Sequence, residues 1–600
     1  MPWLSVVFVL ASASPAVSQY QDWKHSGALF ILTTPEGAPM PAAASVENFP
    51  LLVRLHQDFF DFSQANPNGS DVRFSSATGE PLAYQIEEWN APKGAASIWV
   101  RVPKIAGNSR QQIKLHWGNP GAKSESNGKA VFNESNGYLT VSHMGPAAKD
   151  EVGIVELQDT GTTSVPGVVG AARHFPGQKG IFCGDKIGGY PTDASSHTTE
   201  AWFRAEKPNS YVVAWGNEQA QGKVVMCYRS PPHVIMDCYF SGGNVAGKST
   251  LSKSEWVHVA HTYEKGASCL YVNGVLDGIN TSKSAPLHLK SPSRLWIGGW
   301  YHNYSFVGDI DEVRISKVVR SPDWIRLQYE NQKPLQTLVG PVVQPGNEFE
   351  LAQAPPTLQE GKSVTLTAKA GGAQRLYWTV TRGGKEAVVA TDRLAYTLDA
   401  GRTVGETSAI VRVKAVYPNE VKERQTSFKI TDDIPEPEFA LQAPAEWDGR
   451  KTIEVVPQIT NLESIRSKGA DKLNIVWNVS DLATINETQP GKLILKRAQH
   501  SGKLTVTAAI DNGGAPAVKA ITIAVKEPAK DAWVEYVPSK HEKPEDGQFY
   551  ARDDKNEGAL HYSGVLTEAA DAVFLKVFAG DKPFSSEVQK RRPTARMPLR

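Results

Sequence analysis

Residues 255–278, EWVHVAHTYEKGASCLYVNGVLDG, decide the fold class of this chain. A β-strand turns successive side chains to opposite faces, so a strand buried in a two-sheet structure shows two interleaved sets. The segment WVHVAHTY has these sets: Trp256, His258, Ala260 and Thr262 alternate with Val257, Val259, His261 and Tyr263. Asn273-Gly274, the dipeptide best suited to a type I′ turn, then predicts a β-hairpin.

The same pattern recurs along the chain. Short apolar runs of period two are separated by turns rich in Gly and Pro, of which the chain has 50 and 39. Its 600 residues are too many for one core, so an all-β protein of several domains is expected. The net charge of +1 gives no reason to expect a nucleic acid or an anionic membrane as partner.

The N-terminus, MPWLSVVFVLASASPAVSQ, is typical of a secretory leader. An apolar run is followed by the small residues Ala16 to Ser18, which predicts a signal peptide over residues 1–18 although Lys and Arg are lacking before the run. No later stretch approaches the roughly 20 apolar residues of a membrane span. We therefore expect a secreted, periplasmic or cell-surface protein with no transmembrane segment once the leader is removed.

Residues 19–122 carry a first family resemblance. FPLLVRL, NGSDVRF, LAYQIEEW, IWVRVPKI and LHWGNPGA occur in this order after Trp23. The segment resembles the bacterial domain of unknown function DUF2341, which has no assigned chemistry. The resemblance implies a secreted or envelope multidomain protein, in which a laminin-G-like module often follows.

Residues 123–341 carry the second resemblance. After a loop-rich entry come HTTEAWFRA, the hairpin quoted above, SRLWIGGW and FVGDIDEVRIS. This order is similar to the LamG-like module of the concanavalin A-like lectin/glucanase superfamily, which implies a two-sheet jelly roll.

A weaker repeat follows with a period near 90 residues. FELAQAPPTLQEG and FALQAPAEWDG each precede a Trp that is expected to be buried, Trp378 and Trp477. Two Ig-like sandwiches in tandem are predicted, over residues 346–432 and 437–527. Residues 531–589 resemble part of the β-domain that precedes the hydrolase domain of sialate O-acetylesterase-like proteins. Residues 590–600 form a basic tail or a shifted reading frame.

Three carboxylates within residues 309–312 raise the question of catalysis. Retaining β-glucanases of this superfamily carry E-x-D-x-x-E on one strand, with two carboxylates as nucleophile and acid. Here the pattern is Asp309-x-Asp311-x-x-Arg314, so one carboxylate of the pair is missing. A bulge near Asp311 is predicted instead, with Asp311 a buried hydrogen-bond acceptor and Glu312 facing solvent.

Two further features concern ions and redox state. Asp309 could join Asp185 or Asp193 in a calcium site at a sheet rim, as in relatives that bind this ion; no other cofactor is expected. All four cysteines lie between residues 183 and 269. Cys227 and Cys238 are predicted to lie nearly opposite each other, either as a cross-strand disulfide or as two buried thiols.

The loop GGWYHNYSF, between two predicted strands, is the candidate ligand site. Aromatic rings offer a flat apolar face to the C–H side of a sugar, and amides hydrogen-bond its hydroxyls. The candidate binding residues are Trp300, Tyr301, Asn303, Tyr304 and, on the same rim, Trp215. The alternative is that Trp300 and Tyr304 cap the edge of the core.

The sequence thus predicts a secreted, non-catalytic binding protein that recognises carbohydrate or another surface polymer. Two alternatives stay open. One is a structural or adhesive envelope protein with protein ligands. The other is the accessory N-terminal part of a truncated carbohydrate esterase.

Overall fold

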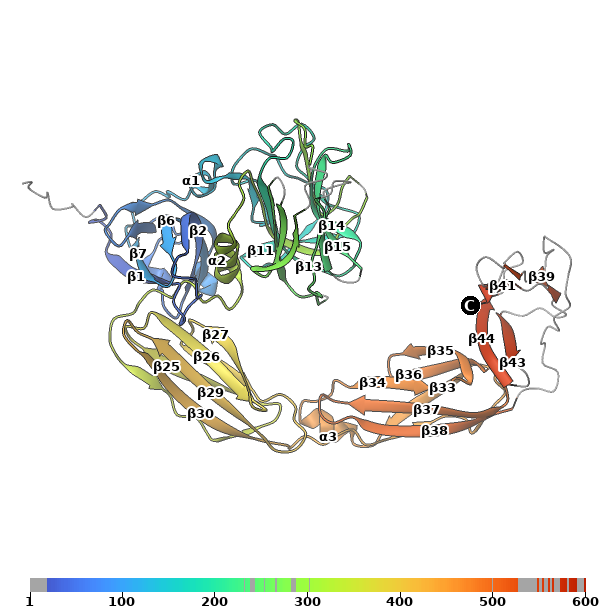
Figure 1. Ribbon diagram of the computed structural model, residues 1–600. Coiled ribbons are helices and arrows are strands. Elements are labelled where there is room, and N and C mark those ends of the chain that lie inside the picture. The colour runs from blue at the N-terminus through green and yellow to red at the C-terminus, as the bar shows by residue number, and fades with distance from the viewer. Residues whose placement is uncertain are drawn as a thin grey trace, which may run out of the picture. The chain divides into compact units, whose positions relative to one another are not determined.

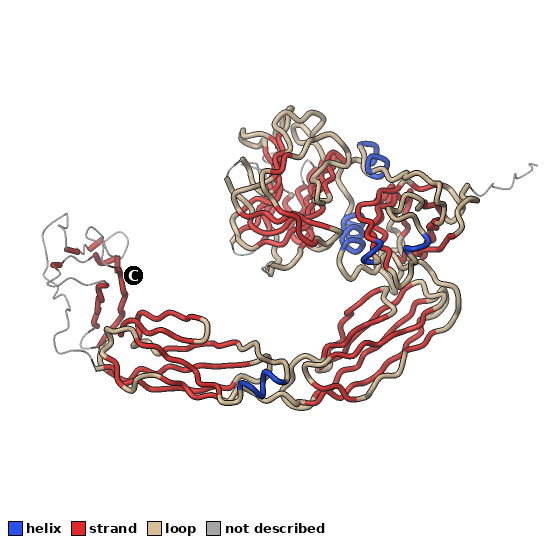
Figure 2. The backbone as a smooth tube through the Cα atoms, turned by 180° about the vertical axis from the view of Figure 1, so that it is seen from behind, coloured by secondary structure: helices blue, strands red, loops and turns tan. Residues whose placement is uncertain are grey.

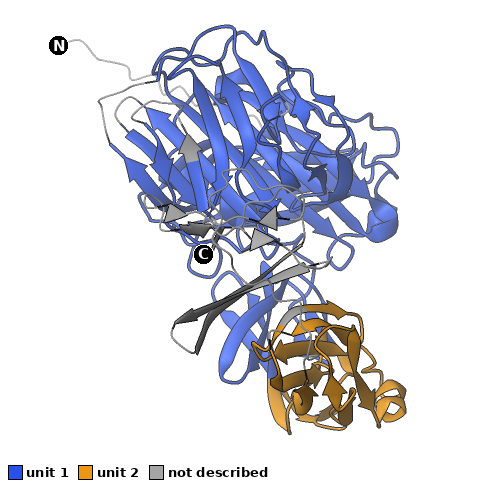
Figure 3. Ribbon diagram, turned by 90° about the vertical axis from the view of Figure 1, so that its right-hand side faces the viewer, with its two compact units in different colours: residues 1–354, 365–396, 410–426 blue, residues 355–364, 397–409, 427–600 orange. Residues whose placement is uncertain are grey.

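A computed structural model describes residues 19–526 except 231–232, 238–242, 253, 265–266, 282–286, 302 and 499, together with short strands beyond residue 547. Figures 1 and 2 show that strands dominate and helices are few and short, so the all-β, multidomain prediction is confirmed. The chain has two compact units, one of residues 1–354, 365–396 and 410–426, the other of residues 355–364, 397–409 and 427–600 (Figure 3).

The N-terminal domain of the first unit has two sheets. One has the strand order β1-β7-β3-β4 and the other β2-β6-β5. The strands are β1 (His25–Leu32), β2 (Ser45–His56), β3 (Arg73–Ser76), β4 (Pro81–Leu82), β5 (Tyr84–Asn90), β6 (Ala95–Ala106) and β7 (Arg110–Trp117). Short helical turns lie between and after them: η1 (Phe62–Gln64), η2 (Ala91–Lys93), α1 (Gly128–Val131) and η3 (Glu134–Asn136).

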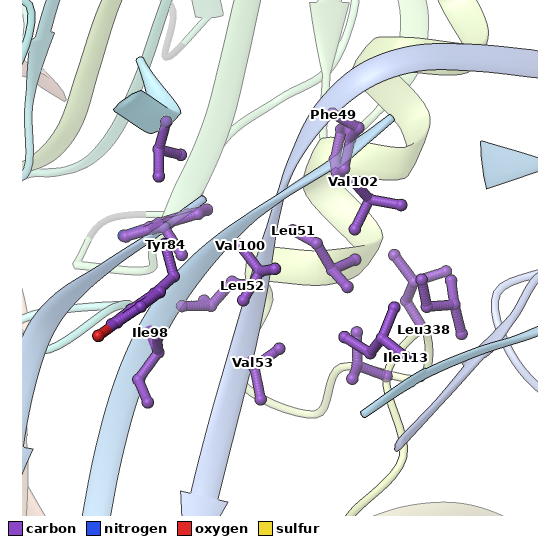
Figure 4. Close-up of a cluster of buried hydrophobic side chains, with 14 of the residues drawn as sticks. Phe49, Leu51, Leu52, Val53, Tyr84, Ile98, Val100, Val102, Ile113 and Leu338 are labelled. Atoms are coloured by element: carbon purple, nitrogen blue, oxygen red, sulfur yellow. The ribbon is translucent and has the colours of Figure 1, made fainter. Parts of the chain in front are cut away.

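Strand β2 is buried on both of its faces. Leu51, Leu52 and Val53 are each at most 1 % exposed, and Figure 4 shows them with apolar side chains of neighbouring strands. A strand covered on one side only would alternate apolar and polar residues. The continuous run therefore indicates that a second element covers the outer face of this sheet.

That element is α2 (Pro322–Gln332), which lies against β2 in Figure 1. Its N-cap residue Ser321 accepts a hydrogen bond from Trp324 N at 3.1 Å, and Pro322 occupies the first turn, both favourable at a helix start. The Trp324 ring meets Phe49 of β2 edge-on, with centroids 5.1 Å apart. Tyr329, on the same helix, stacks on Trp202 at 5.7 Å, so α2 joins the N-terminal domain to the jelly roll.

The jelly roll consists of two large sheets. The first has the order β10-β11-β22-β13-β18-β19-β20, with β8 also pairing with β22, and the second the order β17-β16-β15-β14-β21-β12-β9. The first contains β8 (Tyr138–Ser142), β10 (Thr163–Pro166), β11 (Ala171–Pro176), β13 (His197–Ala205), β18 (Val257–Glu264), β19 (Ala267–Val272), β20 (Val275–Asn280) and β22 (Val307–Ser316). The second contains β9 (Gln158–Asp159), β12 (Ile181–Phe182), β14 (Ser210–Gly216), β15 (Lys223–Arg229), β16 (His233–Asp237), β17 (Val245–Ala246) and β21 (Arg294–Ile297).

The quoted hairpin forms as predicted. Strands β19 and β20 pair antiparallel across Asn273 and Gly274, whose φ angles of 49° and 78° are those of a type I′ turn. In β18, Val257 and Val259 lie in the core between the sheets, whereas Ala260 packs into the cluster shared with the N-terminal domain. Both faces of this strand are therefore buried.

Four further sheets follow. Strands β23 (Phe349–Leu351), β25 (Ser363–Ala370) and β28 (Ala395–Asp399) form one sheet, and β24 (Thr357–Gln359), β30 (Val421–Thr431), β29 (Thr407–Val416), β26 (Arg375–Arg382) and β27 (Lys385–Thr391) form the second. The next pair comprises β31 (Phe439–Gln442), β33 (Ile453–Ile459), β36 (Lys492–Ala498) and β35 (Ala483–Gln489), and then β32 (Glu446–Trp447), β38 (Ala517–Val525), β37 (Gly502–Asp511) and β34 (Asn474–Val479), with α3 (Leu462–Ser467). Trp378 is fully buried and Trp477 is half-buried. The Ig-like class of these sheet pairs stays a prediction.

The ends of the chain are described least. The predicted leader, residues 1–18, lies outside the described residues, as does most of residues 531–600. In that last segment the structure describes short strands, β39 (Gln548–Phe549), β40 (Asp553–Asp554), β41 (Ala559–His561), β42 (Gly564–Val565), β43 (Ala572–Ala579), β44 (Lys582–Lys590) and β45 (Pro598–Leu599). Within the described residues, no helix combines the length and the apolar character needed to cross a bilayer.

Candidate ligand-binding face of the jelly roll

The seven-stranded sheet carries aromatic residues on the face that points away from the other sheet. Along β14 and β21, Trp215, Leu295 and Ile297 belong to the core between the sheets. Trp296, of opposite parity to Leu295 and Ile297, belongs to a separate apolar cluster with Trp300. Tyr211 joins this cluster because the register of β14 shifts between Tyr211 and Val213. We call Tyr211, Trp296, Trp300, Tyr301 and Tyr304 the outer aromatic face.

The loop after β21 holds the exposed part of this face. Trp300 and Asn303 exchange two backbone hydrogen bonds of 3.0 Å, which closes a tight turn. Tyr304 stacks on Tyr211 with ring centroids 4.3 Å apart and planes 10° apart, and Tyr301 packs on Trp296 at 5.2 Å. The loop thus lies over an aromatic layer rather than at the edge of the core.

Two tyrosines of the loop are exposed in an unfavourable backbone conformation. Tyr301 and Tyr304 both have φ of 54°, a left-handed region that costs a residue other than glycine roughly 1–2 kcal/mol. Their side chains are 38 % and 52 % exposed. Backbone strain of this kind clusters at functional sites.

Polar groups surround the aromatic rings. Arg294 lies over Tyr301, with its guanidinium carbon 5.6 Å from the ring centroid. Trp300 Nε1 donates to Glu218, and Lys223 Nζ lies 4.6 Å above the Trp300 ring. The site therefore combines flat apolar surfaces with charged hydrogen-bonding groups at their edges.

Of the predicted site residues, Tyr301, Asn303 and Tyr304 are exposed in this loop. Trp300 is only 3 % exposed and supports the loop from below.

Trp215 is fully buried, and its Nε1 donates to Thr199 Oγ1 at 3.0 Å. The prediction that Trp215 lies on the rim is wrong, because its position on β14 directs its ring into the core. Trp296 and Arg294 were missed, although the alternation of RLWIGGW could have found them. Tyr211 was also missed, because the register shift that separates it from Trp215 is not visible in the sequence.

The carboxylates of β22 all have partners. Asp309 accepts from Arg204 Nε at 2.8 Å and Nη2 at 2.6 Å, and from His174 Nδ1 at 2.8 Å. Asp311 Oδ2 accepts from the backbone N–H groups of Val168 and Val169, at 2.8 and 3.1 Å. The predicted bulge and the role of Asp311 are confirmed, since Glu200 and Trp202 of β13 face Arg314 and Asp311 of β22.

The prediction that Glu312 faces solvent is wrong. Its side chain is 1 % exposed and receives hydrogen bonds from His143 Nδ1 at 2.7 Å and Arg314 Nη2 at 2.5 Å. The bulge gives Glu312 a φ of 49° and turns it to the outer face of the eight-stranded sheet. That face is buried because the N-terminal domain and α2 cover it.

Glu87 of the N-terminal domain completes this buried group, and its carboxylate lies 3.6 Å from His143 Nδ1. Burial raises the pKa of Glu87 to about 7. Burial would also raise the pKa of Glu312, but the charges of His143 and Arg314 outweigh it and lower that pKa below its usual value. Burial would lower the pKa of His143, but Glu312 and Glu87 raise it. The group is thus a charge network in which His143 and Arg314 balance the two carboxylates.

Among the described residues, only Glu87, His143 and Glu312 place three potential metal ligands within 4.8 Å of one another. The suggested calcium residues Asp309, Asp185 and Asp193 do not form such a group. Asp185 and Asp193 are exposed, and the Asp309 oxygens are engaged by Arg204 and His174. As for the suggested disulfide, Cys227 is buried in β15, and Cys238 lies outside the described residues.

Comparison with known families agrees with this architecture. Residues 68–138 match the model of the family described as "Domain of unknown function (DUF2341)". Residues 186–326 match that of the "Concanavalin A-like lectin/glucanases superfamily". The chain therefore contains a DUF2341 domain followed by a concanavalin A-like domain. No curated protein matches it.

Several solved structures are similar to parts of the chain. Domain 4 of an extracellular arabinanase from Geobacillus stearothermophilus, in complex with arabinotriose, is 16 % identical, with 32 % of this chain and 97 % of that chain covered and a TM-score of 0.27. A heptameric SAP-like pentraxin from Limulus polyphemus is 13 % identical, with 26 % and 78 % covered and a TM-score of 0.22. The receptor binding domain of botulinum neurotoxin C/D mosaic serotype is 10 % identical, with 65 % and 93 % covered and a TM-score of 0.28. TM-scores in this range are too low to transfer a function.

Proposed function

We propose that the chain is a secreted, non-catalytic protein that binds carbohydrate through the outer aromatic face. The observation that carries this proposal is the pair Tyr301 and Tyr304, exposed on a left-handed backbone above packed aromatic rings. Their ring faces suit the C–H side of a pyranose or furanose. The Arg294 guanidinium and the Glu218 carboxylate can hydrogen-bond hydroxyl groups at the edge of the sugar.

The absence of catalysis is part of the proposal. Glycoside hydrolysis needs two carboxyl groups on either side of the scissile bond, roughly 5 to 9.5 Å apart. On β22 the Asp309 and Glu312 carboxylates are buried and ion-paired, and Asp311 accepts from the backbone. Each of these carboxylates therefore takes part in interactions that stabilise the fold.

The test is a glycan-binding screen of the full chain and of a variant that carries Tyr301→Ala and Tyr304→Ala. Loss of two stacking surfaces should weaken binding at least about tenfold, which corresponds to about 1.4 kcal/mol. Tyr304→Phe, which keeps the ring, should bind nearly as well as the parent chain. Leu276→Ala is the matched control, because Leu276 is an apolar residue 50 % exposed on β20, outside this face.

Circular dichroism of each variant checks that the sheets are retained. Equal glycan binding by the parent chain and the double variant would contradict the proposal. Binding to cell-surface proteins without any glycan would favour a structural or adhesive role instead.

A further inference from the structure

The first compact unit contains a second concave site, separate from the outer aromatic face. A cavity of about 340 Å³ lies between β2 and β6 of the N-terminal domain, the segment after α2, and the end of β27. This volume is within the range of small-molecule sites. Its polar lining includes Arg54, His56, Ser97, Gln336 and Arg393, and Phe60 and Val342 are among its apolar walls.

Arg54 is held rigidly in this cavity. Its Nη1 donates to Asn331 O at 2.9 Å, and its Nη2 to Gln332 O at 2.6 Å and Val168 O at 3.3 Å. All three acceptors are carbonyl oxygens. Among the described residues, no carboxylate lies within ion-pairing distance of its guanidinium, so its charge is positioned but not neutralised by direct contact.

Arg393 is the second cation of the cavity. Its Nη1 donates to the carbonyl oxygen of Asp392 at 2.8 Å, and it makes no ion pair in the described part of the chain. Two carboxylates lie near it. Asp392, which also lines the cavity, pairs with Arg375 at 3.0 Å, and Asp58 accepts from Leu394 N at 2.7 Å. Burial lowers the pKa of Arg393, and these two charges partly offset the lowering.

Burial lowers the pKa of Arg54 to about 10. The carboxylates of Glu87 and Glu312 oppose this lowering, and the positive charge of Arg393 adds to it. Both arginines remain charged at neutral pH. An anion in the cavity would be attracted by both positive charges. Since both hydrogens of Arg54 Nη2 are taken by carbonyl oxygens, Arg393 is the guanidinium that can offer a planar carboxylate two parallel hydrogen bonds.

We propose that this cavity binds a small organic carboxylate, with its charged end toward Arg54 and Arg393 and its body against Phe60 and Val342. The site gives the DUF2341 part of the chain a binding role of its own. It does not depend on carbohydrate recognition by the outer aromatic face.

Titration calorimetry of the full chain tests the proposal with D-glucuronate and benzoate as probes. D-glucose serves as the uncharged control and inorganic phosphate as the second anion. Binding of either carboxylate at micromolar to millimolar concentrations, with weaker phosphate and no glucose binding, is the expected result. Arg393→Gln should weaken carboxylate binding about tenfold or more.

Arg326→Gln is the matched control, because Arg326 is exposed on α2 and does not line the cavity. The Tyr301→Ala and Tyr304→Ala variant should bind the carboxylate unchanged, which separates this site from the proposed sugar site. The proposal is overturned if neither carboxylate binds, if Arg393→Gln binds as well as the parent chain, or if phosphate binds as tightly as the carboxylates.

Discussion

Replacing Glu312 with glutamine tests the buried charge network on β22. The carboxylate is 1 % exposed and receives two charged hydrogen bonds, from His143 and Arg314. Glutamine has the same shape but carries no charge, and its NH2 group would face one of these donors. Breaking a buried pair in this way costs about 3–5 kcal/mol, because a charge is left uncompensated.

The assay is thermal unfolding by differential scanning calorimetry. For a unit of about 400 residues, a loss of this size should lower the Tm by roughly 4 to 6 °C. Glu134→Gln is the matched control, since Glu134 pairs with Lys317 at 2.9 Å with side chains 59 % and 41 % exposed. A surface pair contributes at most about 1 kcal/mol. If both variants lowered the Tm equally, the assignment of a buried, paired Glu312 would be refuted.

Two further predictions concern the same unit. The folded pKa of Glu87, about 7, lies above its usual value of 4.5, so the folded state binds more protons in this interval and stability falls as pH rises from 4.5 to 7, by about 3 kcal/mol. Urea unfolding at several pH values should show this slope, and Glu87→Gln should make it less steep; an unchanged slope would contradict the assignment. Trp215→Ala should cost about 3–5 kcal/mol, because it opens a core cavity and leaves Thr199 without its hydrogen bond. If the Trp215→Ala variant kept its Tm and lost only sugar binding, the placement of Trp215 in the core would be contradicted.

Local sequence patterns predicted most of the fold. The alternation of WVHVAHTY and the Asn273-Gly274 turn depend on neighbours within a few residues, and both appear as expected. The bulge at Asp311 was also predictable, because Ile310 and Val313 have opposite parity yet both needed burial.

The environment of Glu312 could not be read from the sequence. Its partner His143 lies 169 residues earlier, and Glu87 comes from the N-terminal domain. In an isolated jelly roll the outer face of this sheet would be exposed to solvent. It is buried here because the N-terminal domain and α2 pack against it. The cavity at Arg54 and Arg393 was missed for the same reason, since these two arginines lie far apart in the chain and meet only through tertiary packing.

The most direct test of the central claim is a glycan array of the full chain, run with and without EDTA. The outer aromatic face is proposed to recognise sugar with aromatic rings and charged side chains, so binding is expected not to need a metal ion. The expected result is glycan binding that survives EDTA and is lost in the Tyr301→Ala and Tyr304→Ala variant. Binding that EDTA abolished and calcium restored, or that the double variant retained in full, would contradict the account.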